Sequence, residues 1–336
     1  MHQSTRKNLT INQHARTKIS IFIQAGLLGV GLFLFGCTTS DHPTQNQLMG
    51  VSSSSSQMEK VINQPGPIEF QAITAADWQV SLAGLVNFDH PKAKESKLKD
   101  KLLPIHIYTY LLKHPTHGYF LIDTGLSEKL FKQPKETGIN SLVLSQMNWD
   151  KMILKKSTEQ VIAELPAPLS GVFLTHAHLD HISGVPALPP ATKIYTGPME
   201  LRAKYFINLF INGTTNRILE KIDSPIQELE FKNDPDNKYS GVVDVFGDQS
   251  LFAIHVPGHT DGSLAFVVRT TEGPVLVTGD TCHTAWGWNN EVEPGDFTRN
   301  HENNRKNLIL LKNLSKQFPN MKVKLGHQDL SEVSLN

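Results

Sequence analysis

Cysteine is scarce in this sequence. Only two cysteines occur among its 336 residues, Cys37 and Cys282. Because a zinc finger requires closely spaced pairs of cysteines, the sequence argues against that class of protein. If Cys37 carries a lipid, as its surroundings indicate, a disulfide between the two cysteines is also excluded.

An excess of charge of either sign is lacking as well. Lys plus Arg and Asp plus Glu both number 32, so the formal net charge is zero. Proteins that bind nucleic acid typically present a strong positive excess. The balance argues against a nucleic-acid partner.

A long apolar run occurs near the start of the chain. Residues 19–35 are almost wholly apolar or small, basic residues precede them, and no acidic residue comes before Asp41. The run closes on Leu34-Phe35-Gly36-Cys37, which resembles the bacterial lipobox. We therefore predict a lipoprotein signal peptide over residues 1–36 and a lipid anchor on Cys37; a plain transmembrane anchor is the alternative.

The residues around Cys37 also predict where the protein resides and how it is organised. Thr38 follows the cysteine, which for a Gram-negative lipoprotein implies sorting to the outer membrane, facing the periplasm. Residues 37–67 are rich in Ser, Gln and Asn, and this composition predicts a flexible tether. Residues 68–336 are then long enough for one two-layered domain.

One short stretch, residues 175–181, holds several candidate metal ligands. It follows the apolar run of residues 171–174, which predicts a short buried strand. His176 and His178 alternate, so both side chains can project to one side, whereas Asp180 and His181 lie where the chain turns. Imidazole and carboxylate groups suit zinc, so we predict one metal on the first pair and a second on the other. A solvated His-rich loop is the alternative.

Further polar residues follow other apolar runs. A helix is expected over residues 149–165, which carry apolar residues at helical spacing, and another over residues 198–209. The polar residues at the ends of the remaining predicted strands are Asp123, His259, Asp280 and His327.

Taken in order, these motifs resemble the metallo-β-lactamase fold superfamily. The resemblance implies an α/β fold, an αββα sandwich with two metals at one edge of its sheets. It also implies that Asp280 bridges the metals and that Asp123 orients a ligand. The implied ligands of the first metal are His176, His178 and His259, and those of the second are Asp180, His181 and His327.

The resemblance implies a reaction as well. Two zinc ions, for which iron or manganese could substitute, would share a hydroxide that attacks a carbonyl, and Asp180 would pass a proton to the leaving group. Cys282 is expected to pack rather than react.

The bridging Asp280 favours particular branches of the superfamily. Its presence and the segment before His327 are similar to quorum-quenching lactonases, which implies opening of a lactone or ester. A glyoxalase II-type thioesterase, an iron sulfur dioxygenase and a β-lactamase-like activity are the alternatives. N-acyl-homoserine lactonases place a Tyr three residues after the bridging Asp, where this chain has His283. His283 is therefore expected either to assist the carbonyl or the leaving group, or only to pack near the site.

Overall fold

A computed structural model describes residues 36–47, 49–332 and 335. The predicted signal peptide lies almost entirely outside these residues. Residues 36–336 form one compact unit. Within the part of the chain described here, no helix is both long enough and apolar enough to cross a membrane.

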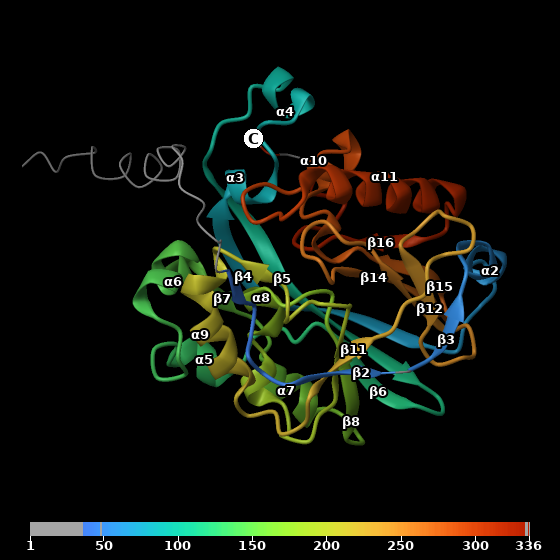
Figure 1. Cartoon of the computed structure of the whole chain (residues 1–336), viewed down its shortest axis with the longest axis horizontal. Helices are drawn as coiled ribbons and strands as arrows, with labels where there is room; N and C mark the ends of the chain where they lie inside the picture. Colours follow the sequence, from blue (N-terminus) through green and yellow to red (C-terminus); the bar gives the residue numbers. More distant parts are fainter. Residues whose placement is uncertain (1–35, 48, 333–334, 336) are drawn as a thin grey trace, which may run out of the picture. The chain divides into compact units, whose positions relative to one another are not determined.

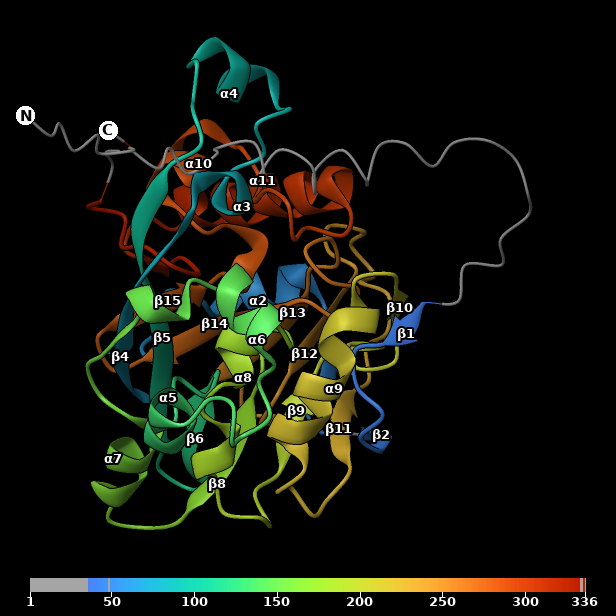
Figure 2. The same cartoon turned by 90° about the vertical axis from the view of Figure 1, so that its left-hand side faces the viewer.

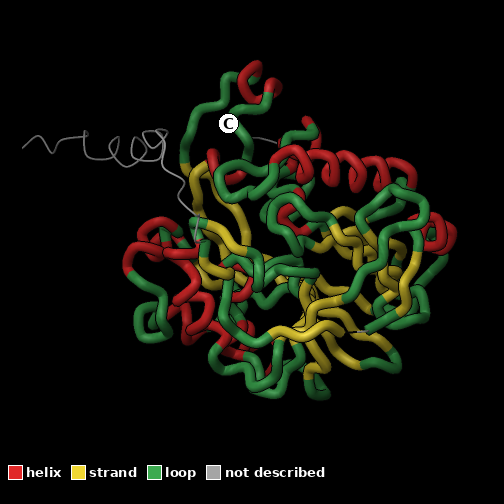
Figure 3. The backbone as a smooth tube through the Cα atoms, in the orientation of Figure 1, coloured by secondary structure: helices red, strands yellow, loops and turns green. Residues whose placement is uncertain are grey.

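Most strands belong to two large sheets (Figures 1 and 3). The first has eight strands in the order β2-β11-β9-β8-β6-β5-β4-β7, and the second has six in the order β16-β15-β14-β13-β12-β3. A small antiparallel pair joins β1 to β10. The strands are β1 (Cys37–Thr38), β2 (Thr44–Gln47), β3 (Val51–Ser53), β4 (Glu69–Ser81), β5 (Leu102–His114), β6 (Gly118–Ile122), β7 (Ile153–Leu154), β8 (Leu169–Phe173), β9 (Ile194–Thr196), β10 (Lys204–Tyr205), β11 (Ile226–Leu229), β12 (Gly241–Asp244), β13 (Leu251–His255), β14 (Leu264–Thr270), β15 (Gly273–Val277) and β16 (Lys322–Lys324).

Helices cover the outer face of each sheet. The helices and 3₁₀ turns are α2 (Ser55–Val61), α3 (Leu82–Leu85), α4 (Pro91–Glu95), α5 (Glu128–Lys132), α6 (Ser141–Gln146), η2 (Trp149–Lys151), α7 (Thr158–Ala163), α8 (Leu179–Ile182), η3 (Val185–Ala187), α9 (Asn208–Leu219), η4 (Gly279–Thr281), α10 (Ala285–Asn290) and α11 (His301–Gln317).

Three apolar clusters hold these layers together. The central one joins the inner faces of the two sheets, with Phe173 of the first sheet packed against Phe266 of the second. A second cluster lies between the eight-stranded sheet and α5, α7, α8 and α9. The third places α2, α10 and α11 against the six-stranded sheet, where Leu308 and Leu311 are fully buried. Helix, sheet, sheet and helix follow one another, which confirms the predicted αββα sandwich.

Strand direction brings the candidate residues to one edge of the sandwich. β6 and β8 are parallel, so Asp123 and the stretch after Phe173 leave the eight-stranded sheet at the same end. β15 and β16 are likewise parallel, so Asp280 and His327 leave the six-stranded sheet together. Residues far apart in the sequence therefore meet where the two sheets end.

The structure differs from the flexible tether predicted for residues 37–67. β2 pairs with β11 and β3 pairs with β12, so this segment adds a strand to each large sheet. Ser54 caps α2 through a capping box, and Met58 of that helix is fully buried. Polar residues form strands here because pairing uses backbone groups, and serine caps a helix well. The folded unit therefore begins at residue 36 and not at residue 68.

Two predicted helices also differ. Residues 149–165 form η2, β7 and α7 in place of one helix, because Ser157 caps a new helix with a capping box and interrupts the periodic pattern. In the stretch predicted as a helix over residues 198–209, Lys204 and Tyr205 instead pair with β1, and the helix α9 begins at Asn208.

Candidate metal centre

The loop after β8 presents the His cluster at the edge of the sandwich. His178 is the N-cap of the short helix α8, which carries Asp180 and His181 in its single turn. The extended chain before this helix carries His176, so the two pairs of side chains leave the backbone in different conformations. The sequence predicted that these two pairs serve different metals, and the two conformations are compatible with that prediction.

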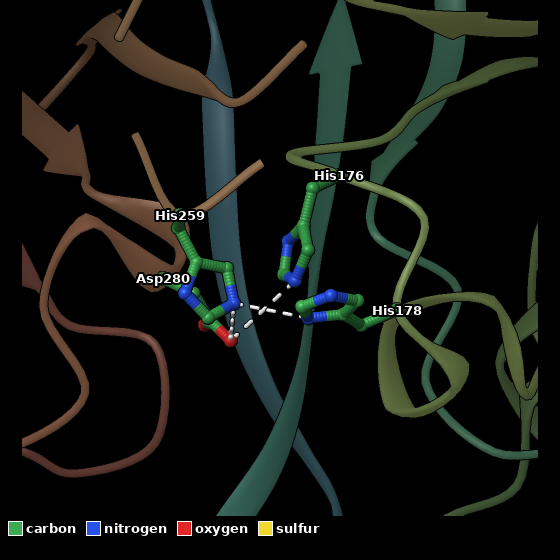
Figure 4. A group of neighbouring side chains, drawn as sticks. All are labelled: His176, His178, His259 and Asp280. Carbon is green, nitrogen blue, oxygen red and sulfur yellow. Dashed lines mark hydrogen bonds and ion pairs between the residues drawn. The ribbon is translucent and has the colours of Figure 1, made fainter. Parts of the chain in front are cut away.

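The first group consists of His176, His178, His259 and Asp280, whose ligand atoms all lie within 4.8 Å of one another (Figure 4). His259 Nε2 lies 3.0 Å from His178 Nδ1 and 3.5 Å from Asp280 Oδ2. His176 Nε2 is also 3.5 Å from Asp280 Oδ2. Two ligands at zinc-bonding distance in a tetrahedral site lie about 3.3 Å apart, so these separations fit a metal ion.

The second group consists of Asp180, His181, His327 and Asp280. His181 Nε2 and His327 Nε2 lie 3.3 Å and 3.4 Å from the same atom of Asp280, Oδ2. Asp180 Oδ2 is 3.3 Å from His327 Nε2. One carboxylate oxygen of Asp280 is therefore shared by both groups.

Hydrogen bonds on the side away from Asp280 orient the imidazole rings of His181 and His327. His181 donates from Nδ1 to Asp123 Oδ2 over 2.8 Å, and the backbone N–H of Thr175 donates to the other oxygen of Asp123. His327 donates from Nδ1 to the backbone oxygen of His106 over 2.9 Å. With Nδ1 engaged outside, Nε2 of each ring faces the centre. Asp123 thus lies where a ligand-orienting group was predicted.

The buried groups at the centre fit a cation. His176 Nε2, His181 Nε2 and Asp280 Oδ1 are buried and have no hydrogen-bond partner. Burial lowers the pKa of His178 to about 4 and that of His176 and His259 well below the usual value, so these rings are neutral, as metal ligands must be.

The two remaining imidazoles respond to the carboxylates. Burial alone would lower the pKa of His327, but Asp280 and Asp180 raise it to about 10. The pKa of His181 is raised for the same reason, with Asp123 also contributing. The negative charge of these buried carboxylates is therefore stabilised by positive charge nearby, which either protons on the imidazoles or a metal ion can supply.

Two glycines allow this close approach. A Cβ at Gly326 would lie 2.2 Å from Asp280 Oδ1, so any side chain before His327 would displace the shared carboxylate. Gly279, directly before Asp280, has a φ of 51° and lies against Thr175. Gly326 is thus required by close contact with the Asp280 side chain, and Gly279 by its left-handed backbone conformation.

His283 contacts the shared carboxylate of the centre. Its Nε2 is 2.9 Å from Asp280 Oδ2, and its ring lies between those of His259 and His327. It is buried, and Nδ1 has no hydrogen-bond partner. Cys282, next to it, points into the apolar layer under α11, where burial raises the pKa of its thiol to about 12.

One residue that ties the centre together gave no signal in the sequence. Glu200 is buried and accepts from the backbone N–H of Ala177 over 2.7 Å, between the first two histidines. Its other oxygen accepts from the hydroxyl of Thr260 and from the backbone N–H of Gly262, which both belong to the loop that begins after His259. It thus fastens the two loops that carry the first ligand group.

Comparisons with known proteins agree with this geometry. The sequence profile of the Metallo-beta-lactamase superfamily matches residues 103–327. An N-acyl homoserine lactonase AttM of Azorhizobium caulinodans is 29% identical over 190 residues, which cover 55% of this chain and 68% of the relative. The AttM lactonase of Agrobacterium fabrum is 28% identical over 189 residues, with the same coverage.

Solved structures show the same fold. A crystal structure of the B. thuringiensis protein AiiA, with N-decanoyl-L-homoserine bound at its active site, aligns with a TM-score of 0.54 and 19% identity, covering 80% of this chain and 95% of that one. A probable metal-dependent hydrolase from Staphylococcus aureus aligns with a TM-score of 0.55 and 13% identity, covering 79% and 90%. With its two linked ligand groups at the sandwich edge, the chain belongs to the metallo-beta-lactamase superfamily and is a metal-dependent hydrolase that is similar in sequence to N-acyl homoserine lactonases.

Proposed function

We propose that the protein holds two zinc ions and hydrolyses a lactone or a related carboxylic ester. His176, His178 and His259 would hold the first ion, and the second would lie between Asp180, His181 and His327; these six residues and the shared Asp280 form the two groups. When bound, the ions would polarise the carbonyl and lower the pKa of water enough to supply a hydroxide nucleophile at neutral pH. The observation that carries the proposal is the single oxygen of Asp280 that faces both groups.

The residues around the metals would handle the protons and the substrate. Asp180 has the more exposed side chain of the two carboxylates, 14% against 3% for Asp280, so it would be able to take the proton released by the attacking water and deliver it to the leaving group. His283 has a free Nδ1 and can donate a hydrogen bond where lactonases of this type carry a tyrosine. No serine or cysteine nucleophile is required, because water supplies the attacking oxygen.

The substrate class follows from the relatives. Both AttM relatives are N-acyl homoserine lactonases, so an acylated lactone is the first substrate to test. We also propose export and lipid attachment at Cys37, in the outer membrane facing the periplasm. The lipobox-like sequence before Cys37 and the free thiol of this residue support the proposal.

An assay panel tests the proposed reaction. The zinc-loaded full chain is offered acyl-homoserine lactones, lactoylglutathione and a chromogenic cephalosporin, and we expect the lactones to be cleaved best. His178→Ala should abolish turnover, whereas His42→Ala, which removes an imidazole from the start of the chain, should leave it unchanged. Full activity of the His178→Ala variant would refute the mechanism, and preference for lactoylglutathione would assign a thioesterase.

A further inference from the structure

The start of helix α9 presents apolar side chains to solvent. Of the ten large apolar side chains that are exposed in the described part of the chain, four lie within residues 206–210. The buried residues of the helix are Asn208, Thr214, Thr215, Ile218 and Leu219, so its contribution to the apolar core comes mostly from its last turn. At its first turn the polar Asn208 is buried while its apolar neighbours are exposed, which is the reverse of the usual arrangement in a helix packed on a core. The four exposed residues, here called the α9 patch, are Phe206, Ile207, Leu209 and Phe210.

The α9 patch contains two aromatic rings in contact with each other. The rings of Phe206 and Phe210 meet edge to face, with centroids 5.9 Å apart. Phe206 is 65% exposed and Phe210 is 47% exposed. Clusters of exposed apolar side chains are typical of surfaces that bind a membrane or another protein.

The predicted lipid attachment point lies directly beside this patch. Cys37 of β1 is paired with Tyr205 of β10, the residue before Phe206. Asn212 of α9 donates from Nδ2 to the backbone oxygen of Thr38 over 3.0 Å, which fixes β1 against the helix. Figure 2 shows β1, β10 and α9 side by side. The end of β1 and the exposed turn of α9 therefore belong to one part of the surface.

No flexible segment separates Cys37 from the folded unit, so a lipid on this residue would be held close to the α9 patch. A lipid on Cys37 would join the folded unit with no spacer, because the strand β1 begins at that residue. The acyl chains would then enter the membrane within a few residues of the α9 patch. We propose that the α9 patch is the surface with which the protein sits on a lipid bilayer, with its aromatic and aliphatic side chains in the zone between headgroups and acyl chains.

A bilayer at this position would also lie close to the metal centre. The guanidinium of Arg299 lies 4.5 Å from the ring centroid of Tyr205, and the backbone N–H of Arg299 donates to the backbone oxygen of His259 over 2.9 Å. Two contacts thus connect the membrane-facing segment to a predicted metal ligand. The inference rests on the proposed membrane location and not on the identity of the substrate.

The test measures whether the patch enters the membrane. The full chain carrying Phe206→Trp is reconstituted into vesicles of phosphatidylethanolamine and phosphatidylglycerol with brominated acyl chains, and the vesicles are recovered by flotation. A matched variant, Val51→Trp, adds a tryptophan at an equally exposed site on β3 (59% exposed), which lies on the opposite side from α9 in Figure 1. Emission of the unsubstituted chain, with its four native tryptophans, is subtracted.

We expect bromine to remove about half or more of the emission added at position 206 and almost none of that added at position 51, since an interfacial helix is buried by ~5–10 Å. Flotation without quenching at position 206 would overturn the membrane-facing surface and leave the lipid anchor standing. A blue shift there without quenching would also overturn it and assign a protein occupant. Failure to float would overturn both the surface and the membrane location. Lactone hydrolysis, measured separately, reports on the proposed reaction alone.

Discussion

At the scale of single residues, the centre depends on groups that touch no metal as well as on the ligands. Asp123 and Glu200 each use both carboxylate oxygens to hold backbone or ring N–H groups near the metal-binding loops. A ligand set assembled from four loops has no single rigid support, so such groups decide whether the ligand atoms stay within reach of a common ion.

Glu200→Gln tests this fastening directly. The amide keeps only one acceptor oxygen, so the side chain can no longer accept from the N–H of Ala177 on one side and from Thr260 and Gly262 on the other. We expect kcat/KM to fall by about 10–100-fold together with zinc affinity, as for other groups that support metal ligands. The control is Glu220→Gln, at an exposed position. Unchanged kcat/KM and metal affinity in the Glu200 variant would show that the loops hold without it.

His283 offers a second test at this scale. His283→Phe keeps an aromatic ring of similar size but removes both nitrogens, and we expect turnover to fall by about 10²-fold if the imidazole supports developing charge. His283→Tyr restores a donor and should improve cleavage of homoserine lactones relative to the Phe variant. Equal rates for all three proteins would assign His283 to packing.

At the scale of secondary structure, the sequence predicts some elements well and others poorly. Every predicted metal ligand follows an apolar run, because a buried strand that ends at a site is recognisable by its composition. The strands and helix of residues 37–61 were not recognisable, because serine-rich segments owe their structure to backbone pairing and capping. His106 could not be predicted as a contributor either, since it acts through a backbone oxygen that any residue would supply.

The role of residues 37–67 in the fold can be measured as stability. Met58 is fully buried against the six-stranded sheet, so Met58→Ala should lower the free energy of unfolding by about 2–5 kcal/mol. Lys60→Ala, at a surface position of the same helix, should change it by less than about 0.5 kcal/mol. The free energy of unfolding of both variants is measured by urea denaturation. If residues 37–67 were a flexible tether, neither substitution would change it.

At the scale of the whole folded unit, the site is a consequence of topology. Parallel pairs in both sheets deliver the ends of β6, β8, β15 and β16 to one edge, and the central apolar cluster holds the two sheets together. The ligands thus come from positions separated by up to about 150 residues, and only the completed sandwich brings them within bonding range of a common ion. The order of motifs along the sequence indicated this arrangement through its resemblance to a known superfamily, whereas the distances required the structure.

The most direct test of the account is the number of metal ions that Asp280 holds together. Metal content per chain is measured by mass spectrometry on the zinc-loaded protein and on Asp280→Asn, alongside lactone hydrolysis. The account predicts two zinc ions per chain in the unaltered protein, activity that chelation removes and zinc restores, and loss of at least one ion together with the activity in the variant. A fully active protein with one ion per chain, or an Asp280→Asn variant that keeps both ions and its activity, would contradict it.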